Sequence, residues 1–244
     1  MKIAMIRVGV DASATSGGIQ GPLFKDGSFE FIPIPENPAV TVKYTYGDLA
    51  GRHGQHLGHY FPKSRKSAME AHGVHNDPEW ETYTYGDWSR PKSSLKHLEK
   101  GDILMFTCGL QGWDFCSDPG IYLAGYFVIE VAILVTKSFS QRKLLSIFGQ
   151  NDHVRNYTVA ELVEIYDGKL VLVKGSFQNR LLKKAVLLST TSQDSKGRTL
   201  KVLSPKMQCI FGDFGGKISI QRSPTRWIDP AHTKQVADYL QSLD

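Results

Sequence analysis

The stretch Gly101-Asp102-Ile103-Leu104-Met105-Phe106, together with the apolar run over residues 122–135, decides the fold class of this 244-residue chain. A helical turn over residues 93–100 is expected to end at Gly101, and Asp102 then leads into a buried strand. The run over 122–135 predicts one long strand or a bent pair of strands. Glu130 interrupts this run, and the run is too short to cross a bilayer.

Sequence patterns on both sides of this stretch predict further strands and helices. Residues 2–8 predict a first buried strand, and Lys25-Asp26-Gly27-Ser28 is typical of a hairpin turn. Asp167-Gly168 suits a type I′ turn and predicts a second hairpin over 163–173. Helices are predicted over 63–72 and 138–149, and over about 230–243 from the N-cap pair Asp229-Pro230.

Strands that follow strands through short turns favour an antiparallel or mixed sheet over a doubly wound parallel one. The expected fold is therefore α+β, with a curved, mixed and mostly antiparallel sheet and flanking helices. No segment is rich enough in Gly, Pro and Ser to separate domains, so a single domain over residues 1–244 is expected.

Charge is divided unevenly along a chain whose net charge is +5. Residues 1–136 carry −3, residues 137–226 carry +10, and residues 227–244 carry −2. An acidic half that bears a site, beside a basic half, is what an enzyme acting on a polyanion needs, and nucleic acid is the favoured partner. Three cysteines without zinc-knuckle spacing, and a start that does not resemble a signal peptide, favour free thiols and a cytoplasmic location.

The pentapeptide Tyr-Thr-Tyr-Gly-Asp occurs twice, at residues 44–48 and 83–87. Histidines 53, 56, 59, 72 and 75 lie between the two copies. Aromatic rings can stack on a base, carboxylates can activate water, and histidines can move protons. The structural alternative is that Thr-Tyr alternation forms strands and Gly-Asp forms turns. Both interpretations remain open from the sequence.

A series of short motifs resembles one prokaryotic family. The motifs are Arg7-x-Gly9-x-Asp11, Gly17-Gly18, Pro22-Leu23-Phe24, Asp26-Gly27-Ser28, Ile32-Pro33-Ile34-Pro35, His75-x-Asp77-Pro78, Gly101-Asp102 with Phe106, and Gly125 before an apolar strand. In this order they resemble the nucleotide-modification-associated domain proteins of the third type. That bacterial and archaeal family is linked to modified DNA bases and to conflict with phages, so the resemblance implies action on a modified nucleotide.

The resemblance has one departure and one looser companion. Where members of the family often have Cys-His-Leu-Asp-Pro, this chain has Val74-His75-Asn76-Asp77-Pro78, so cysteine chemistry is not carried over. Residues 98–106 followed by 125–131 look like the base-reading barrels of the PUA and EVE type, which hold a flipped base in an aromatic pocket. This similarity allows a closed barrel as an alternative form of the expected sheet.

The main functional hypothesis is a DNA glycosylase that removes a hydroxymethylated or glucosylated base from double-stranded phage DNA in antiviral defence. Such an enzyme flips the nucleotide, and a carboxylate stabilises the charged sugar and activates water. The candidate carboxylates are Asp11, Asp77, Asp87 and Glu79. The base pocket is assigned to Tyr46, Tyr83, Tyr85, Trp80, Trp113 and His75, with Asn151-Asp152-His153 bordering it. Contacts to the DNA backbone are assigned to Arg7, Lys63, Arg65, Lys66, Arg155, Arg180, Arg222 and Arg226.

Each assignment has a structural alternative. Arg7 lies in an apolar strand and needs a partner, because a buried unpaired guanidinium is costly, and Asp11 is the nearest carboxylate. Asp77 before Pro78 also suits a simple turn.

Metal binding is the competing interpretation of the histidines, whose spacing of three, together with Asp77, would suit zinc or iron. The chain has no HExxH motif or Cys pair, and Gly51, Gly54 and Gly58 oppose a rigid helix, so neither a metal nor a cofactor is expected. Two alternative functions remain: a reader that binds a flipped modified base without chemistry, and a metal-dependent nucleotide-modifying enzyme.

Overall fold

The computed structural model describes residues 1–12, 18–37, 42–221 and 224–243, and an eight-stranded mixed sheet forms the centre of this described part. Along the sheet the order is β12 (Arg226–Trp227), β1 (Ile3–Arg7), β6 (Ile103–Gly112), β7 (Gly120–Leu134), β8 (Val171–Gly175) and β5 (Thr84–Asp87). β2 (Gly21–Leu23) pairs with β6, and β9 (Arg180–Leu187) pairs with β7. β1 and β2 run parallel to β6, and the other pairs are antiparallel. The α+β class is therefore confirmed.

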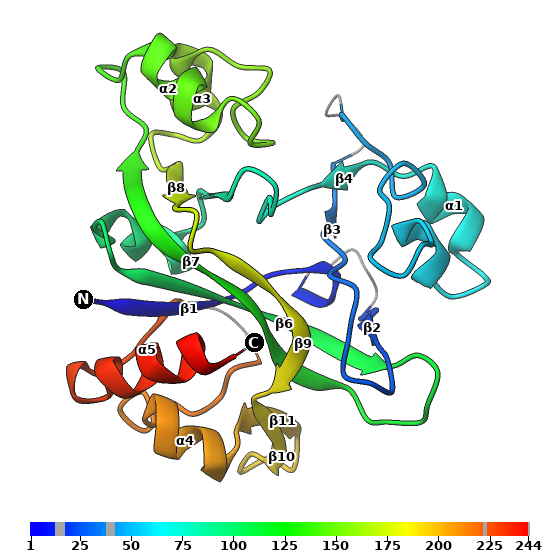
Figure 1. Cartoon of the computed structure of the whole chain (residues 1–244). Helices are drawn as coiled ribbons and strands as arrows, with labels where there is room; N and C mark the ends of the chain where they lie inside the picture. The colour runs from blue at the N-terminus through cyan, green and yellow to red at the C-terminus, as the bar shows by residue number, and fades with distance from the viewer. Residues whose placement is uncertain (13–17, 38–41, 222–223, 244) are drawn as a thin grey trace.

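Strand β7 is shared between two parts of the sheet, as its long curved arrow in Figure 1 shows. Its first part pairs with β6 and β9, and its second part pairs with β8. The register shifts between Ile129 and Val131, so Glu130 is the extra residue of a bulge. A bulge bends and twists a strand. The apolar run that Glu130 interrupts is therefore one bent strand, which confirms the prediction of a long strand.

The sheet of the described residues does not close into a barrel. Its order ends at β12 and β5, which pair with β1 and β8 and not with each other. β12 has two residues and β5 has four, so neither edge offers a ladder long enough to join distant ends. The barrel that the PUA and EVE similarity left open is wrong.

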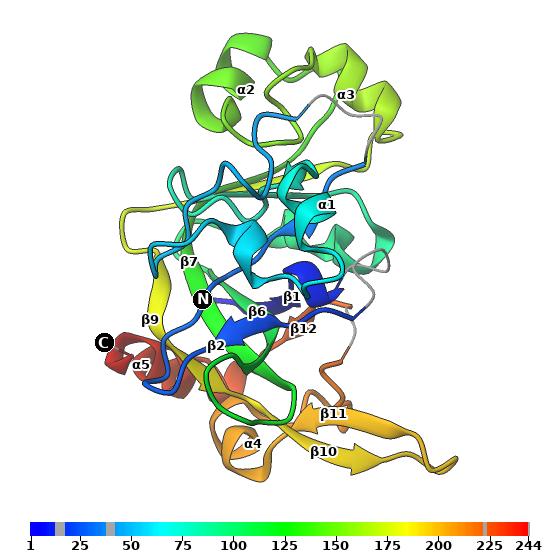
Figure 2. The ribbon, with the colours of Figure 1, turned by 90° about the vertical axis from the view of Figure 1, so that its right-hand side faces the viewer.

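Smaller elements surround the sheet. Two further two-stranded sheets are β10 (Ser189–Gln193) with β11 (Thr199–Leu203), and β3 (Ile34–Pro35) with β4 (Val74–His75). The helices are α1 (Lys66–Glu70), α2 (Gln141–Phe148), α3 (Val159–Ile165), α4 (Pro205–Phe211) and α5 (Thr233–Ser242). The 3-10 helices are η1 (Val10–Ala12), η2 (Leu57–Tyr60), η3 (Arg90–His97) and η4 (Pro230–His232). Figures 1 and 2 show α2 and α3 at one end of the molecule, and α4, α5 and the β10–β11 hairpin at the other.

Two of the predicted helices form close to where the sequence places them. α2 buries Leu144 and Phe148, and the Ser140 side chain caps its first turn. At the end of the chain, Asp229 accepts a hydrogen bond of 2.9 Å from the Ala231 amide, and η4 and α5 then cover residues 230–242. The helix predicted over 63–72 is shorter than expected: α1 has only five residues.

The hairpin predicted over residues 163–173 is wrong. α3 occupies Val159–Ile165, and β8 begins only at Val171. Asp167 and Gly168 do adopt positive φ angles of 52° and 63°, as a type I′ turn requires, but here they follow a helix. The capping box formed by Thr158 and Glu161, and the burial of Val159 and Leu162, favour the helix over a strand.

Three hydrophobic clusters form the interior of the described residues. The sheet cluster contains most of β1, β6 and β7 and is centred on rings such as Phe106 and Phe127. The helical cluster packs α2 and α3 against Val135 and Leu172. The N-terminal cluster contains Ile32, Tyr46, Leu57, Tyr60, Phe61, Val74 and Val10. No helix in the described ranges is long and apolar enough to span a membrane.

Candidate functional site

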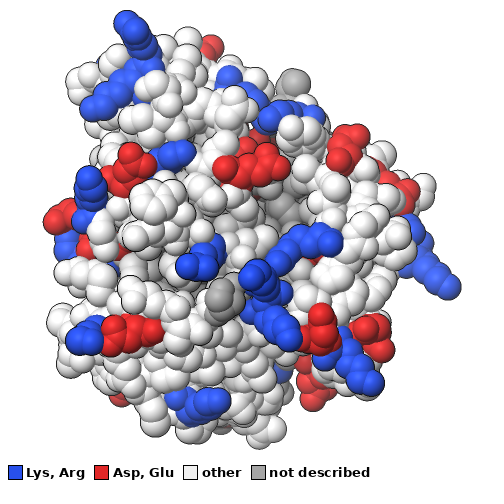
Figure 3. Space-filling view, in the orientation of Figure 1, with Lys and Arg blue, Asp and Glu red and all other residues white. Residues whose placement is uncertain are grey.

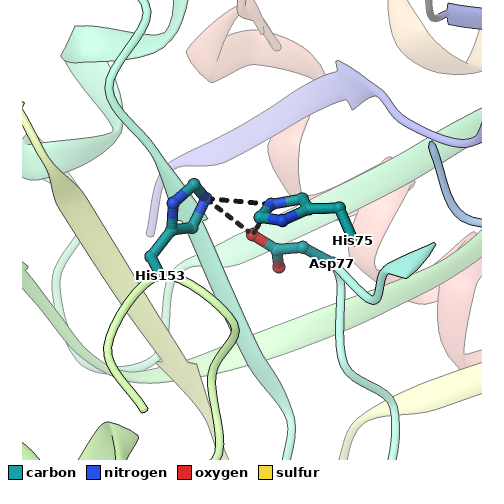
Figure 4. Close-up of side chains that lie close together, drawn as sticks. All are labelled: His75, Asp77 and His153. Atoms are coloured by element: carbon teal, nitrogen blue, oxygen red, sulfur yellow. Dashed lines mark hydrogen bonds and ion pairs between the residues drawn. The ribbon is translucent and has the colours of Figure 1, made fainter. Parts of the chain in front are cut away.

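Two histidines and an aspartate from distant parts of the sequence converge where these three clusters meet (Figure 4). His75 ends β4, Asp77 follows it, and His153 lies between α2 and α3. The two Nε2 atoms of the histidines are 3.2 Å apart. Asp77 Oδ2 lies 3.4 Å from Nε2 of His153 and 3.9 Å from Nε2 of His75. We call these three residues the His-Asp-His cluster.

The ring nitrogens that face away from the cluster are also bonded. His75 Nδ1 donates to Glu36 Oε2 at 2.8 Å. Burial alone would raise the pKa of Glu36, but the hydrogen bond and the charge of His75, together with the Asn37 amide, outweigh burial and lower it. Glu36 is therefore a charged acceptor that fixes the His75 tautomer. His153 Nδ1 and the Tyr166 hydroxyl share a hydrogen bond of 3.0 Å, and burial raises the pKa of Tyr166 to about 12. Both rings are therefore held with Nε2 toward Asp77.

Asp77 is the most buried member of the cluster, with a side chain only 2% exposed. Its Oδ2 accepts a hydrogen bond of 2.8 Å from the Gly86 amide, whereas its buried Oδ1 has no hydrogen-bond partner among the described residues. Burial raises the pKa of Asp77 well above its usual value, against the attraction of His75. Burial also lowers the pKa of His153. A carboxylate enclosed in this way is a feature of reactive sites and of cation sites.

Gly86 in β5 allows His153 to reach this position. A Cβ atom at residue 86 would lie 2.4 Å from Cδ2 of the His153 ring, so any larger residue would displace the ring. Asn151 and Asp152 hold the same loop, because Asn151 donates to Thr84 Oγ1 at 3.2 Å and Asp152 accepts from the Asn76 amide. The second pentapeptide, residues 83–87, is thus part of the site through its backbone.

A cavity of about 220 Å³ adjoins the cluster, and its lining includes the three cluster side chains, Tyr85, Trp88 and Lys92. Trp88 is 54% exposed, and its ring centre lies 6.2 Å from that of Tyr166. A second cavity, of about 510 Å³, shares Trp88 and is also lined by Tyr166, Arg90 and Lys169. An exposed indole between two cavities offers a flat surface on which a base can stack.

Asp87 lies on the wall of the smaller cavity, where it is bonded on two sides. Its Oδ2 is 2.9 Å from Lys92 Nζ and accepts a hydrogen bond of 2.9 Å from the Tyr85 hydroxyl. Burial alone would raise its pKa, but Lys92 and the Ser89 amide outweigh burial and lower it. Asp87 is therefore a charged partner of Lys92, beside the cluster.

Two of the candidate carboxylates lie elsewhere. The Asp11 side chain is 1% exposed and pairs with Arg7, whose Nε donates to it at 2.9 Å and whose Nη1 donates to the Gln221 carbonyl. Both groups are therefore used within the fold. Glu79 is buried against Thr82 and Thr84 and lines a third cavity, of about 400 Å³, together with Trp80.

The candidate aromatic residues are spread over several environments. Tyr46 is fully buried in the N-terminal cluster and donates to the Pro33 carbonyl at 2.8 Å, so it belongs to the core and not to a pocket. Tyr83 packs its ring against Phe127 in the sheet cluster. Trp113 is 45% exposed and lies beside Tyr60, away from the His-Asp-His cluster. Among the candidates, Tyr85 and His75 line the 220 Å³ cavity.

The cations assigned to DNA contact come from separate regions of the fold. Lys63, Arg65 and Lys66 lie at α1, Arg155 between α2 and α3, Arg180 at the start of β9, and Arg226 in β12. Arg155 pairs with Asp152 at 2.9 Å, and Arg226 donates to the Ser219 carbonyl. Arg222 lies outside the described residues. On the face in Figure 3, Lys and Arg alternate with Asp and Glu.

Sequence reasoning missed Glu36, Trp88 and Tyr166 as parts of the site. Trp88 directly follows the second pentapeptide, and this position is the one sequence signal that pointed to it. Glu36 and Tyr166 reach the cluster through the pairing of β3 with β4 and through the end of α3, which the sequence did not reveal.

Comparison with known protein families finds a match over almost the whole chain. A family model described as nucleotide modification associated domain 3 matches residues 2–242. No curated protein and no solved structure matches the chain. The family's description links it to modified nucleotides and so to nucleic acid. This chain belongs to the nucleotide modification associated domain 3 family.

Proposed function

We propose that this chain is a DNA glycosylase that excises a modified base and leaves an abasic site. The observation that carries the proposal is the His-Asp-His cluster in the wall of a cavity shared with the exposed ring of Trp88. Membership of a family associated with nucleotide modification supports a modified base as the group removed.

The cavity supplies the groups that such a reaction needs. A flipped nucleotide would stack its base on Trp88 and bring its sugar toward the cluster. Water then attacks C1′, the bond from C1′ to the base nitrogen breaks, and the base leaves as a protonated, neutral molecule. Asp77 would accept the proton from water, and a cluster imidazole would supply one to the leaving base. Arg90, Lys92 and Lys169 line the two cavities and would face the phosphates.

The biological consequence follows from the product. The proposed substrate is phage DNA with hydroxymethylated or glucosylated bases, and removing such a base would leave a strand that is prone to break at the abasic site. The proposed role is therefore antiviral defence.

The test is incubation of the full chain with hydroxymethylated and with glucosylated phage DNA, followed by mass spectrometry of the released small molecules. A free modified base, with alkali-labile sites left in the strand, is the expected result. General acid–base groups contribute roughly 10²–10⁴-fold, so Asp77→Asn should lower release at least about 100-fold. Asp118→Asn, at an exposed position away from the cluster, is the matched control and should retain full activity. Intact DNA under varied conditions would refute the proposal.

One observation favours a second candidate, a reader that binds the modified base without chemistry. The Asp77 side chain is 2% exposed while Trp88 is 54% exposed, so a ligand meets the stacking surface before it meets the carboxylate. A reader would retain modified DNA and release nothing. It would lose affinity by about 1–3 kcal/mol on Trp88→Ala, as expected for a stacked base.

A further inference from the structure

We propose that His75, Asp77 and His153 bind one divalent transition-metal ion, Zn²⁺ or Fe²⁺, through His75 Nε2, His153 Nε2 and Asp77 Oδ2. The inference rests on geometry and does not require the glycosylase proposed above, whose proton transfers by Asp77 and a cluster imidazole belong to the ion-free chain. It also departs from the sequence expectation of no metal, because that expectation considered histidines 53–75 and did not include His153.

The three ligand atoms have the spacing of a metal site. Bond lengths of 2.0–2.2 Å place two ligands of one ion roughly 3.0 Å apart at a right angle and roughly 3.4 Å apart at a tetrahedral angle. The observed separations are 3.2, 3.4 and 3.9 Å. An ion therefore needs a movement of only a few tenths of an ångström, chiefly between His75 and Asp77.

The surroundings of the rings are those of metal ligands. A histidine that binds a metal through one nitrogen usually donates from the other nitrogen to a carboxylate, carbonyl or hydroxyl. His75 donates to Glu36 in this way, and His153 Nδ1 is bonded to Tyr166. The tautomer fixed by Glu36 directs the lone pair of His75 Nε2 into the cluster, toward the Asp77 carboxylate. A cation between His75 Nε2 and Asp77 Oδ2, which lie 3.9 Å apart, would satisfy both acceptors at once.

The buried oxygen of Asp77 is an independent observation. Asp77 Oδ1 has no hydrogen-bond partner in the described part of the chain, although its side chain is 2% exposed. Leaving a buried carboxylate oxygen unsatisfied is costly. A cation beside the carboxylate offsets this cost, directly if the carboxylate becomes bidentate and electrostatically if it does not.

The cavity determines the type of site. Three protein ligands leave at least one coordination position, and the 220 Å³ cavity is lined by the same three side chains. Closed structural zinc sites use four protein ligands, whereas two histidines and one carboxylate with open positions are typical of catalytic zinc and iron(II) sites. The open position would face water or substrate.

The test uses the full chain, stripped with chelator and titrated with Zn²⁺ in air and with Fe²⁺ under anaerobic conditions. Calorimetry should give one ion per chain, and metal analysis after gel filtration should recover it. His153→Gln and Asp77→Asn should weaken binding by more than about 100-fold, and Glu36→Gln by about 10–100-fold, as changes next to a ligand usually do. His97→Ala, an exposed histidine in η3, is the matched control and should bind as the parent chain does.

Three outcomes would overturn the inference. They are binding no tighter in the parent chain than in His153→Gln, equal loss in His97→Ala, and Co²⁺ giving the same visible absorption in the parent chain and the cluster variants. Circular dichroism of each variant separates loss of the site from loss of the fold. A chain that binds the ion but releases no base would support this inference and refute the glycosylase. Base release that persists in a chain shown to bind no ion would support the glycosylase and refute this inference.

Discussion

At the scale of single residues, the contact of Gly86 with the His153 ring holds the site together. β5 runs past the loop between α2 and α3 at a distance that leaves no room for a Cβ atom at residue 86. The Gly86 amide also donates to Asp77. One residue without a side chain therefore positions two members of the cluster.

Gly86→Ala should damage the site by crowding. The new methyl group would lie 2.4 Å from the ring of His153, and overpacking of this kind costs about 1–3 kcal/mol. We expect a lower free energy of unfolding in urea and loss of metal binding. Gly120→Ala is the control, because its Cβ would meet the Leu187 and Tyr122 side chains far from the cluster. Unchanged ion affinity in Gly86→Ala would contradict the role given to this contact.

Asp87 and Lys92 should make stability depend on pH. The pKa of Asp87 is lowered in the folded chain, so its contribution is present above the unfolded value of about 3.9 and is lost as pH falls through the folded value. Asp87→Asn leaves Lys92 unpaired and should cost about 3 kcal/mol at pH 7. Urea unfolding at pH 7 and pH 3 should show this difference shrinking in acid.

The control for this pH dependence is the exposed pair of Lys169 with Asp167. Exposed pairs contribute little to stability, so Asp167→Asn should leave the unfolding midpoint nearly unchanged at both pH values. A constant difference between the parent chain and Asp87→Asn over the whole range would argue against the Asp87–Lys92 pair as its source.

At the scale of elements, the repeated pentapeptide shows that one sequence can take two structures. Residues 44–48 form a turn, in which Asp48 accepts from the amide and hydroxyl of Thr45. In the second copy, Thr84–Asp87 forms β5, because β8 lies alongside and supplies a ladder of hydrogen bonds. Tyr46 and Tyr85, the central tyrosines of the two copies, are both buried. The repeat therefore fixes which side chain faces inward, while the neighbouring chain decides between turn and strand.

The same scale explains which elements the sequence predicted. The strand after Gly101 and the helices over 141–148 and 233–242 have strong apolar periodicity or clear caps, so local information was sufficient. The region 163–173 was predicted incorrectly because Asp-Gly serves equally well after a helix and between two strands. The feature that decides for a helix is the capping box of Thr158 and Glu161, which lies upstream of residue 163.

Thr158→Ala should weaken α3 by removing this cap. Loss of an N-cap hydroxyl costs about 1 kcal/mol. We expect a lower urea midpoint and faster amide hydrogen exchange in residues 159–165, with little change in β6 and β7. Thr190→Ala on β10, where the residue is exposed, tests whether any loss of a threonine has the same effect. Equal exchange rates in α3 of the two variants would count against the cap.

At the scale of the whole molecule, the candidate site joins three hydrophobic clusters. Val74 belongs to the N-terminal cluster and precedes His75, and Val154 belongs to the helical cluster and follows His153. β5 brings Gly86 from the sheet. His75 and Asp77 were identified from the sequence because they share one motif. The pairing with His153 was not identified, because residues 77 and 153 are far apart in the sequence and are brought together by tertiary packing.

Damage to the helical cluster should therefore reach the site. Phe148 is fully buried in α2, and Phe148→Ala should cost about 3–5 kcal/mol. Local unfolding is cooperative within such units, so hydrogen exchange should rise over α2, α3 and the His153 loop before it rises in β6. Ion binding should weaken together with it. Phe177→Ala, at a position 89% exposed, is the control and should change neither property.

The connection between β6 and β7, residues 113–119, divides the chain between the two groups of ligands. A cut after Cys116 would leave His75, Asp77, Gly86 and Glu36 in one fragment, and His153 with Tyr166 in the other. Neither fragment alone would hold the cluster, but the antiparallel ladder of β6 with β7 would bring the fragments back together. Binding of an ion at the proposed site would then depend on fragment complementation, and it would report that the two fragments have reassembled.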